Sequence, residues 1–256
     1  MSKIQAIAMN TFKEAVRDRI LYAILVFAIA MIAGTVILAR IGAGSGEKVI
    51  RDFGLGFISI FGTLIAVFLG IGLVHKEIDR RTIYTIVSKP IHRSQFILGK
   101  YLGLCFTLFV NVAIMTATLV GIIYFFGEGL WDFRLVAASA MIFMELMVIT
   151  GIAVLFSAFS TPALSAIFTL SLFAIGRLLN DFRIFGEKYA GATAGKVIGG
   201  LYYLLPNLAR FNISTEVVHG VPLGEVISGM TILYGLLYVV TLLALTALIF
   251  QRRDFR

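Results

Sequence analysis

Six long apolar stretches run through this chain and constrain its fold more than any other feature. They cover residues 20–39, 55–74, 101–126, 135–159, 162–179 and 226–250. A helix needs about 20 mostly apolar residues to cross ~30 Å of hydrocarbon. Helices are expected because each satisfies its own backbone hydrogen bonds in lipid, whereas a β-barrel would show alternating segments of about ten residues. The sequence therefore predicts an all-α integral membrane protein with six transmembrane helices.

The composition leaves no room for a soluble catalytic domain. Of the 256 residues, 59% are hydrophobic and only 14% are charged, against roughly 25% charged in a soluble domain. We therefore expect one transmembrane domain over residues 1–256. The single cysteine, Cys105, excludes an internal disulfide and a zinc site built from several cysteines. It is interpreted as a small packing residue.

Positive charge is concentrated on one side of the predicted spans. That side holds the N-terminus, residues 75–100 and the C-terminus, with 13 Lys and Arg against 5 Asp and Glu, and the difference of +8 equals the net charge of the chain. Cytoplasmic loops carry the excess of Lys and Arg. We expect a multi-pass protein of the cytoplasmic (inner) membrane with both termini in the cytoplasm. The basic face suits anionic lipid headgroups, so no nucleic-acid partner is expected.

Two segments outside the spans have a pattern of their own. Residues 3–19 place apolar side chains on one helical face, which predicts an amphipathic helix lying in the membrane interface on that face. The alternative is a cytoplasmic extension of the first span. Residues 180–224 form the longest predicted extracytoplasmic segment, in which Gly191, Gly195 and Gly199 share one helical face. A short helix or re-entrant hairpin is expected there.

The segment between the second and third spans, residues 75–100, is the strongest functional candidate. Its basic sequence includes the apolar residues Ile83 and Tyr84, which a simple solvated loop does not need. Ser88-Lys89-Pro90 breaks a helix because proline restricts the preceding residue and lacks an N–H group. A short helix is expected from Glu77 to Ser88, and a second one from Pro90 to Lys100. This pattern of helix, kink and helix favours docking into the groove of a partner over a solvated basic loop.

The same segment resembles the first cytoplasmic loop of type-2 ABC export permeases. The likeness rests on an acidic residue before a threonine, a Ser-x-Pro turn, an arginine and a Gly-Lys pair entering the third span. The matching residues are Glu77-Ile78-Asp79-Arg80-Arg81-Thr82-Ile83, Ser88-Lys89-Pro90-Ile91, Arg93, Phe96 and Gly99-Lys100. Arg81 stands where many members of the family have glycine. The N-terminal helix, the six spans and the Arg-Arg-Asp-Phe tail fit the same family, so the resemblance covers essentially the whole chain.

The resemblance implies a cytoplasmic coupling helix that docks on a separate ATP-binding subunit. The residues assigned to this contact are Glu77, Asp79, Arg80, Arg81, Thr82, Ile83, Tyr84, Ser88, Lys89, Pro90 and Arg93. The family also implies two copies of the ATPase, which bind ATP and Mg²⁺, and a second copy of this chain. Pro206-Asn207-Leu208 and Phe211-Asn212 are similar to the branch that contains the permease for copper-site maturation of nitrous oxide reductase.

No nucleotide-binding or catalytic motif is evident in the chain itself. A phosphate loop requires G-x-x-x-x-G-K-[ST], and the nearest match, Gly191 to Val197, is one residue short. We therefore expect neither a catalytic residue nor a cofactor in this chain. Met141, Met144 and Met147 recur at three-residue spacing. Thioethers can bind Cu(I), but methionine also fills helix contacts, so we predict packing and no metal site.

Two polar side chains lie inside predicted spans. Glu145 is in the fourth, where a carboxylate is costly and must face a cavity or a partner. It is a candidate substrate-pathway or proton-linked site, and the alternative is a hydrogen-bonded packing residue. No His or Asp partner for it is evident in the other spans. Asn111 in the third span predicts an interhelical hydrogen bond.

These observations are compatible with three functions. The leading one is a permease subunit that moves an unidentified substrate with energy from a separate ATPase. The second keeps the ATPase but passes its motion to an extracytoplasmic partner protein without transport. The third, an intramembrane enzyme, requires paired catalytic groups at one depth, which the sequence does not show.

Overall fold

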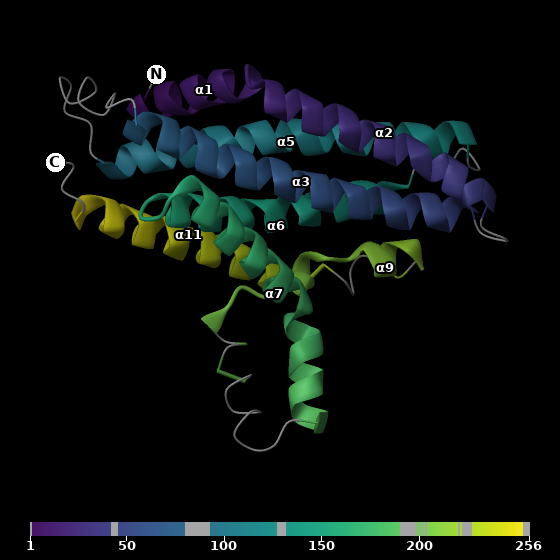
Figure 1. Cartoon of the computed structure of the whole chain (residues 1–256). Coiled ribbons are helices and arrows are strands. Elements are labelled where there is room, and N and C mark those ends of the chain that lie inside the picture. Colours follow the sequence, from purple (N-terminus) through teal and green to yellow (C-terminus); the bar gives the residue numbers. More distant parts are fainter. Residues whose placement is uncertain are drawn as a thin grey trace.

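The chain is a bundle of long helices in the computed structural model (Figure 1). The structure describes residues 2–41, 46–79, 93–126, 132–189, 199–200, 202, 204–219, 221 and 227–252. Six helices in these ranges are long and apolar enough to cross a membrane. They are α2 (Arg19–Ile41), α3 (Gly46–Asp79), α5 (Arg93–Phe126), α6 (Phe133–Ser157), α7 (Pro162–Tyr189) and α11 (Gly229–Arg252). The predicted all-α class with six spans is confirmed.

Several of these helices continue beyond the apolar stretches that predicted them. Helices α3 and α5 have 34 residues each, which corresponds to about 51 Å of helix. That length exceeds the ~30 Å hydrocarbon core. The predicted separate helix from Pro90 to Lys100 is, from Arg93 onward, the first part of α5. The end of α3 and the start of α5 lie at the same end of the bundle as both termini of the described chain (Figure 1).

The N-terminal helix α1 (Lys3–Val16) begins with a capping box. Ser2 Oγ accepts a hydrogen bond from the Gln5 N–H, and the Gln5 side chain accepts one from the Ser2 N–H. Asp18 then receives the Ile20 N–H and starts α2. Every residue of the predicted apolar face is buried or half-buried, namely Ile4, Ile7, Ala8, Thr11, Phe12, Ala15 and Val16.

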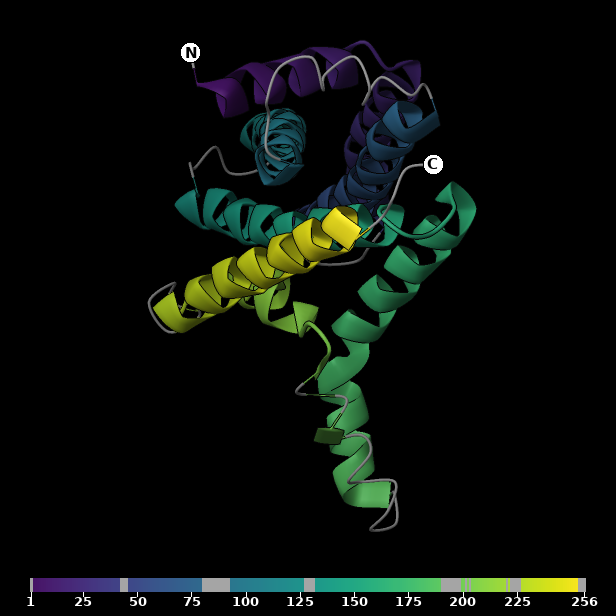
Figure 2. The same ribbon diagram turned by 90° about the vertical axis from the view of Figure 1, so that its left-hand side faces the viewer.

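A protein surface covers that apolar face of α1. Gly99 and Gly103 of α5 lie against Ile7 and Thr11, and Phe12 packs edge-on to Phe106 at a centroid distance of 4.7 Å. In the view of Figure 2, α5 is seen end-on and α1 lies across it. The face that we expected to rest on lipid therefore rests largely on α5. The location of α1 at a membrane surface stays a prediction.

Helix α3 forms the centre of the bundle and contacts α2, α5, α6 and α7. Three glycines eight residues apart let its neighbours approach closely. A Cβ at Gly54 would lie 2.3 Å from Leu119 of α5, and one at Gly62 would lie 2.6 Å from Leu146 of α6. A Cβ at Gly70 would lie 2.8 Å from Ala153 Cβ. These contacts fix α5 and α6 against α3 and position the buried charges described below.

Helix α7 leaves the bundle along its length. Its final part projects away from the other helices in both views (Figures 1 and 2). The helix reaches Tyr189, so the first ten residues of the predicted segment 180–224 continue the fifth span as helix. Of the three glycines predicted to share a face, Gly191 and Gly195 lie outside the described residues.

Part of the predicted extracytoplasmic segment is packed into the bundle. The 3-10 helix η1 (Leu208–Phe211) and the short helix α9 (Ser214–Val218) follow α7, and both Leu208 and Phe211 are fully buried. Gly176 of α7 allows the Pro206 carbonyl to approach, because a Cβ there would lie 2.7 Å from that oxygen. This connection therefore closes the space between α7, α6 and α11.

Candidate functional site

A buried ion pair links three helices near the middle of the bundle. Glu145, at the midpoint of α6, is fully buried. Arg177 of α7 donates from Nε to Glu145 Oε1 and from Nη2 to Oε2, each at 2.8 Å. Ser59 Oγ of α3 accepts a further hydrogen bond from the same Nη2. A bidentate guanidinium–carboxylate pair is among the strongest polar contacts in proteins.

The surroundings of Arg177 explain how a charge is tolerated there. Its guanidinium lies over the Phe173 ring with 5.5 Å to the centroid, in a cation–π arrangement. The side chain is 24% exposed, whereas that of Glu145 is 0% exposed. The pair can therefore be reached from the arginine side only. Breaking such a pair leaves an uncompensated charge in an apolar setting, so we interpret it as a device that ties α3, α6 and α7 together.

The sequence analysis did not find this partner. The predicted fifth span, residues 162–179, ends two residues after Arg177, which puts this arginine at its outer end, and no His or Asp partner for Glu145 was evident in the other spans. The structure corrects that placement, because α7 continues for twelve residues beyond Arg177, to Tyr189. An arginine inside one span and a glutamate inside the preceding span was the available signal, since buried charges in membranes pair with one another.

Asn111 makes a different contact from the one predicted. Its Nδ2 donates to the Thr107 carbonyl at 2.8 Å, one turn earlier in α5. Its Oδ1 is buried without a partner among the described residues. The expected interhelical hydrogen bond is therefore replaced by one within the helix.

The methionines beside Glu145 take part in helix packing. Met141 is buried, and the Met147 carbonyl accepts a hydrogen bond from the Tyr101 hydroxyl at 3.0 Å. Met144 lies close to Gly235 of α11. Within the described ranges, no group of three His, Cys, Asp or Glu residues could hold a metal ion.

Most of the predicted coupling residues lie outside the described residues. These are Arg80, Arg81, Thr82, Ile83, Tyr84, Ser88, Lys89 and Pro90. Glu77 and Asp79 belong to the last turn of α3, and Arg93 is the first residue of α5. The three therefore stand on the two helices that lead into and out of the candidate contact, and their roles stay predictions.

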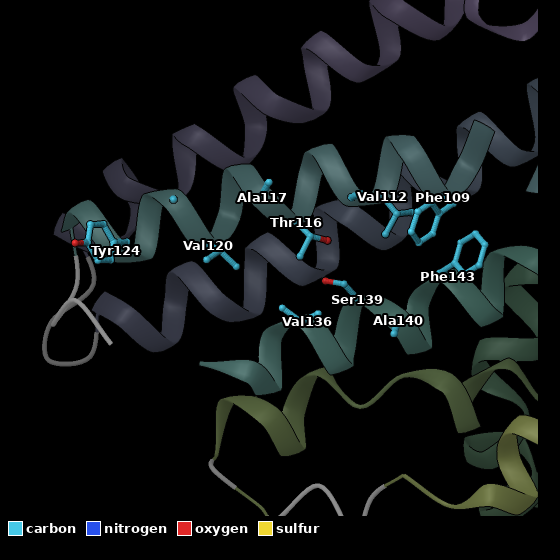
Figure 3. A pocket seen from close by; sticks show the side chains of 12 residues that line it. Phe109, Val112, Thr116, Ala117, Val120, Tyr124, Val136, Ser139, Ala140 and Phe143 are labelled. Atoms are coloured by element: carbon cyan, nitrogen blue, oxygen red, sulfur yellow. The ribbon is translucent and has the colours of Figure 1, made fainter. Parts of the chain in front are cut away.

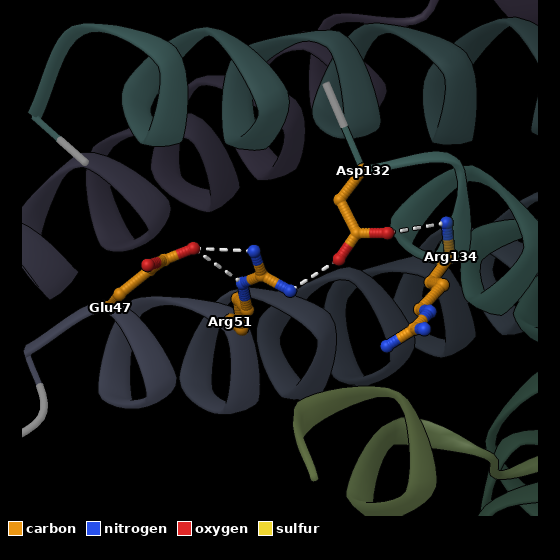
Figure 4. A network of polar contacts seen from close by, with 4 residues as sticks. All are labelled: Glu47, Arg51, Asp132 and Arg134. Atoms are coloured by element: carbon orange, nitrogen blue, oxygen red, sulfur yellow. Dashed lines mark hydrogen bonds and ion pairs between the residues drawn. The ribbon is translucent and has the colours of Figure 1, made fainter. Parts of the chain in front are cut away.

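The opposite end of the bundle carries a charged cluster that joins α3 to α6 (Figure 4). Arg51 Nε donates to Glu47 Oε1 at 3.0 Å, and its Nη1 is paired with Asp132. Asp132 also caps α6 by accepting the Arg134 N–H at 2.9 Å. One carboxylate therefore fixes the start of α6 and its distance from α3.

A tyrosine and two arginines join the outer part of α7 to the connection that follows it. Arg183 lies over the Tyr202 ring at 4.9 Å, and Arg210 Nη2 donates to the Tyr202 hydroxyl at 3.4 Å. The hydrogen bond from Arg210 is the main reason that the pKa of Tyr202 is lowered from its ordinary value. Asn207 completes the contact by donating to Asn180 Oδ1 at 2.8 Å.

A comparison with protein families identifies the chain. The model of the ABC-2 family transporter proteins matches residues 5–255. The chain belongs to the ABC-2 transporter family. It is therefore a membrane permease subunit of an ABC transporter. A search of curated proteins finds no match.

Membership of the ABC-2 family bears on how the buried ion pair is interpreted. ABC-2 permeases are in general membrane components without enzymatic activity, which associate with an ATP-binding subunit and dimerise. In such a permease, a charged tie between three spans is a means of holding helices in register.

Proposed function

We propose that this permease moves a substrate across the cytoplasmic membrane as one half of a symmetric transporter. Two copies of the chain would form the pathway, and two ATP-binding subunits, which bind ATP and Mg²⁺, would drive it from the cytoplasm. The family match over residues 5–255 is the observation that carries the proposal. Positive charge is clustered beside both termini, which supports a cytoplasmic location for the end of the bundle that would contact the ATP-binding subunits.

The mechanism that the geometry supports is rigid-body transmission through α3. The helix runs without a break from Ser59 to Asp79, a rise of about 30 Å. Its Asp79 end leads to the proposed ATPase contact, and Ser59 is hydrogen-bonded to the Arg177–Glu145 pair. Closure of the ATPase pair would tilt α3, and the ion pair would carry that tilt to α6 and α7.

The coupling contact itself is proposed for residues 77–93, with Thr82 and its neighbours at the ATPase surface. Charge reversal provides the test. Arg80→Glu with Arg81→Glu should lower ATP turnover by the complex with its ATP-binding subunit, while the chain remains folded. Arg17→Glu, an exposed arginine at the end of α1, is the matched control. Unchanged turnover in the double variant would count against coupling through this segment.

The proposed orientation can be tested on its own. In a Cys105→Ala background, His219→Cys introduces an exposed thiol in the connection after α9. Ser2→Cys introduces an exposed thiol at the N-terminus. A membrane-impermeant maleimide should label position 219 in intact cells and position 2 only after permeabilisation. The opposite pattern would reverse the assignment of both termini.

The permease branch and the cargo are finer questions. The residues similar to the branch for copper-site maturation, Pro206 to Asn212, include the buried Asn207, Leu208 and Phe211. We propose membership in that branch on these residues. The wild-type chain should copurify with a copper-site maturation factor, and a Phe211→Leu variant should retain less of it. Absence of the factor from the wild-type preparation would count against this branch.

Transmission of force to an extracytoplasmic partner is the second candidate. It is favoured by the projecting end of α7, where Phe182, Ile184 and Phe185 are each about half exposed. The test measures the ATPase activity of the complex and transport into sealed vesicles. Stimulation of the ATPase by a soluble extracytoplasmic protein, without transport of a substrate, would support this candidate over transport.

A further inference from the structure

A long groove runs between α5 and α6 on a face unrelated to the ion pair (Figure 3). Its volume is about 600 Å³, which is within the usual range for a small-ligand site. The walls are almost wholly apolar. Ala113, Ala117 and Ala140 in these walls are exposed, so the groove is open to the side of the bundle. Both helices are long and apolar enough to cross a membrane, so the groove opens sideways at the level of the hydrocarbon.

The two ends of the groove differ. Phe109 of α5 and Phe143 of α6 meet edge to face at 5.6 Å and close one end. Tyr124 lines the other end, which is the end nearer Asp132. Tyr124 follows Phe109 by fifteen positions, a rise of about 22 Å along α5. The groove is therefore narrow and elongated, and it runs in the direction of a lipid acyl chain.

Two hydroxyl groups inside the groove have no partner in the described structure. Thr116 is 8% exposed and Ser139 is 4% exposed, and neither side-chain oxygen is hydrogen-bonded. Figure 3 shows both hydroxyls directed toward the space between the two helices. By contrast, Thr107 and Thr118 of the same helix α5 donate to carbonyls one turn earlier at 2.9 Å. A buried polar group without a partner is destabilising, so these hydroxyls call for an acceptor from outside the chain.

The depth of the hydroxyls indicates which acceptor. The charged residues Asp132 and Arg134 mark the start of α6 and the level of the headgroups. Ser139 lies five residues further along the helix, about 7.5 Å deeper. Ester carbonyls of a glycerolipid occupy this region between headgroup and hydrocarbon, and they accept hydrogen bonds but cannot donate them.

The narrow shape of the groove and its two unpartnered hydroxyls favour a lipid chain over a protein helix. The backbone carbonyls of a helix already accept hydrogen bonds within that helix, so they would not satisfy Thr116 and Ser139. We propose that the groove binds one acyl chain of a glycerolipid from the adjacent leaflet, and that Thr116 and Ser139 donate hydrogen bonds to its ester carbonyls. This site goes beyond the transport function and does not depend on the identity of the cargo.

Photolabelling tests the position of the chain. The full-length permease is placed in nanodiscs with phosphatidylcholine that carries a diazirine in its acyl chain, and labelled residues are mapped by mass spectrometry. Labels should concentrate on residues 109–116 and 139–143, the part of the groove between the two hydroxyls and the Phe109–Phe143 end. Ala117→Phe, which fills the groove, should abolish them, whereas Ala30→Phe, at an exposed position of α2, should not. Equal labelling of α2 and the groove, or undiminished labelling of Ala117→Phe, would overturn the proposal.

A second measurement tests the hydroxyls. Native mass spectrometry compares retention of an ester-linked phosphatidylglycerol with that of its diether analogue, which lacks the carbonyls. Wild-type protein should prefer the ester by about fivefold, the worth of one or two hydrogen bonds. Thr116→Val with Ser139→Ala should remove the preference. Equal retention of both lipids by the wild type would contradict the assignment, as would a second copy of the chain cross-linking through the groove.

Discussion

Gly103 of α5 lies so close to α1 that a Cβ on it would be 2.5 Å from the carbonyl oxygen of Ala8. The same Cβ would be 2.7 Å from Thr11 Cβ. Neither atom belongs to the flexible end of a side chain, so α1 can yield only by moving its backbone. The docking of the N-terminal helix therefore depends on the absence of one methyl group.

Gly103→Ala should release α1 from α5. Steric overlap of this kind costs about 1–3 kcal/mol, and limited proteolysis should then cut after Lys13 or Arg17 faster than in the wild type. Gly121→Ala in the same helix is the control, because a Cβ there meets nothing within 4 Å. The control should keep or slightly raise stability, since alanine favours helix by roughly 0.5–1 kcal/mol. Identical proteolysis of both variants would show that α1 is not held at Gly103.

Removing one member of the Glu145–Arg177 pair should cost more than removing both. Arg177→Met leaves the carboxylate buried without its counterion, and we expect a loss of about 3–5 kcal/mol in the free energy of unfolding. Glu145→Met combined with Arg177→Met should recover most of that loss because apolar residues then fill the space. Denaturation in detergent, followed by circular dichroism, measures both. A double variant whose loss equals the sum of the single losses would contradict the pairing.

Phe211→Ala should destabilise the bundle although the residue lies outside every predicted span. Phe211 is fully buried, stacks on Tyr234 at 6.3 Å and packs against Gly235. Truncation of a buried phenylalanine costs about 3–5 kcal/mol. Phe133→Ala is the comparison, because Phe133 is 74% exposed and should lose little. Equal melting temperatures for the two variants would show that the connection after α7 is not part of the core.

The cluster around Arg51 should give a smaller, salt-dependent effect. Asp132→Asn keeps a cap for α6 but removes the ion pair, and we expect a loss of about 0.2–1 kcal/mol. Asp132→Ala also removes the cap, which adds about 1 kcal/mol. The difference between wild type and Asp132→Asn should shrink in high salt, because these side chains are partly exposed. An effect of Asp132→Asn that is independent of salt would indicate a role other than the ion pair.

The six spans were predictable because the energy of placing residues in lipid depends mainly on their composition. The ends of the helices were not, since α3, α5 and α7 continue into polar sequence. An apolar run shows what lies in hydrocarbon, whereas hydrogen bonding of the backbone continues until a cap or a break. For this reason residues 180–189, expected to be the start of the extracytoplasmic segment, are the last turns of α7.

The ion pair and the groove were missed for a different reason. Arg177 and Glu145 are 32 positions apart, and their contact depends on how α7 crosses α6. Thr116 and Ser139 are small polar residues in two different spans, and nothing in the sequence relates one to the other. Only the packing of α5 against α6 shows that their hydroxyls lack the carbonyl of the preceding turn. Both features are properties of helix pairs and have no signature in a single span.

The order in which α6 and α7 are synthesised has a consequence for assembly. Glu145 reaches the membrane first, and the guanidinium that neutralises it follows with the next span. Until α7 is inserted, Glu145 has no counterion within the membrane. Helix α7 itself has the lowest mean hydropathy of the six described spans. Helix α6 therefore needs the guanidinium of Arg177 as a counterion, and α7 needs the carboxylate of Glu145 for the same purpose. Insertion of the fifth span therefore depends on correct placement of the fourth. A misplaced α6 would remove the ion pair that stabilises α7 in the membrane.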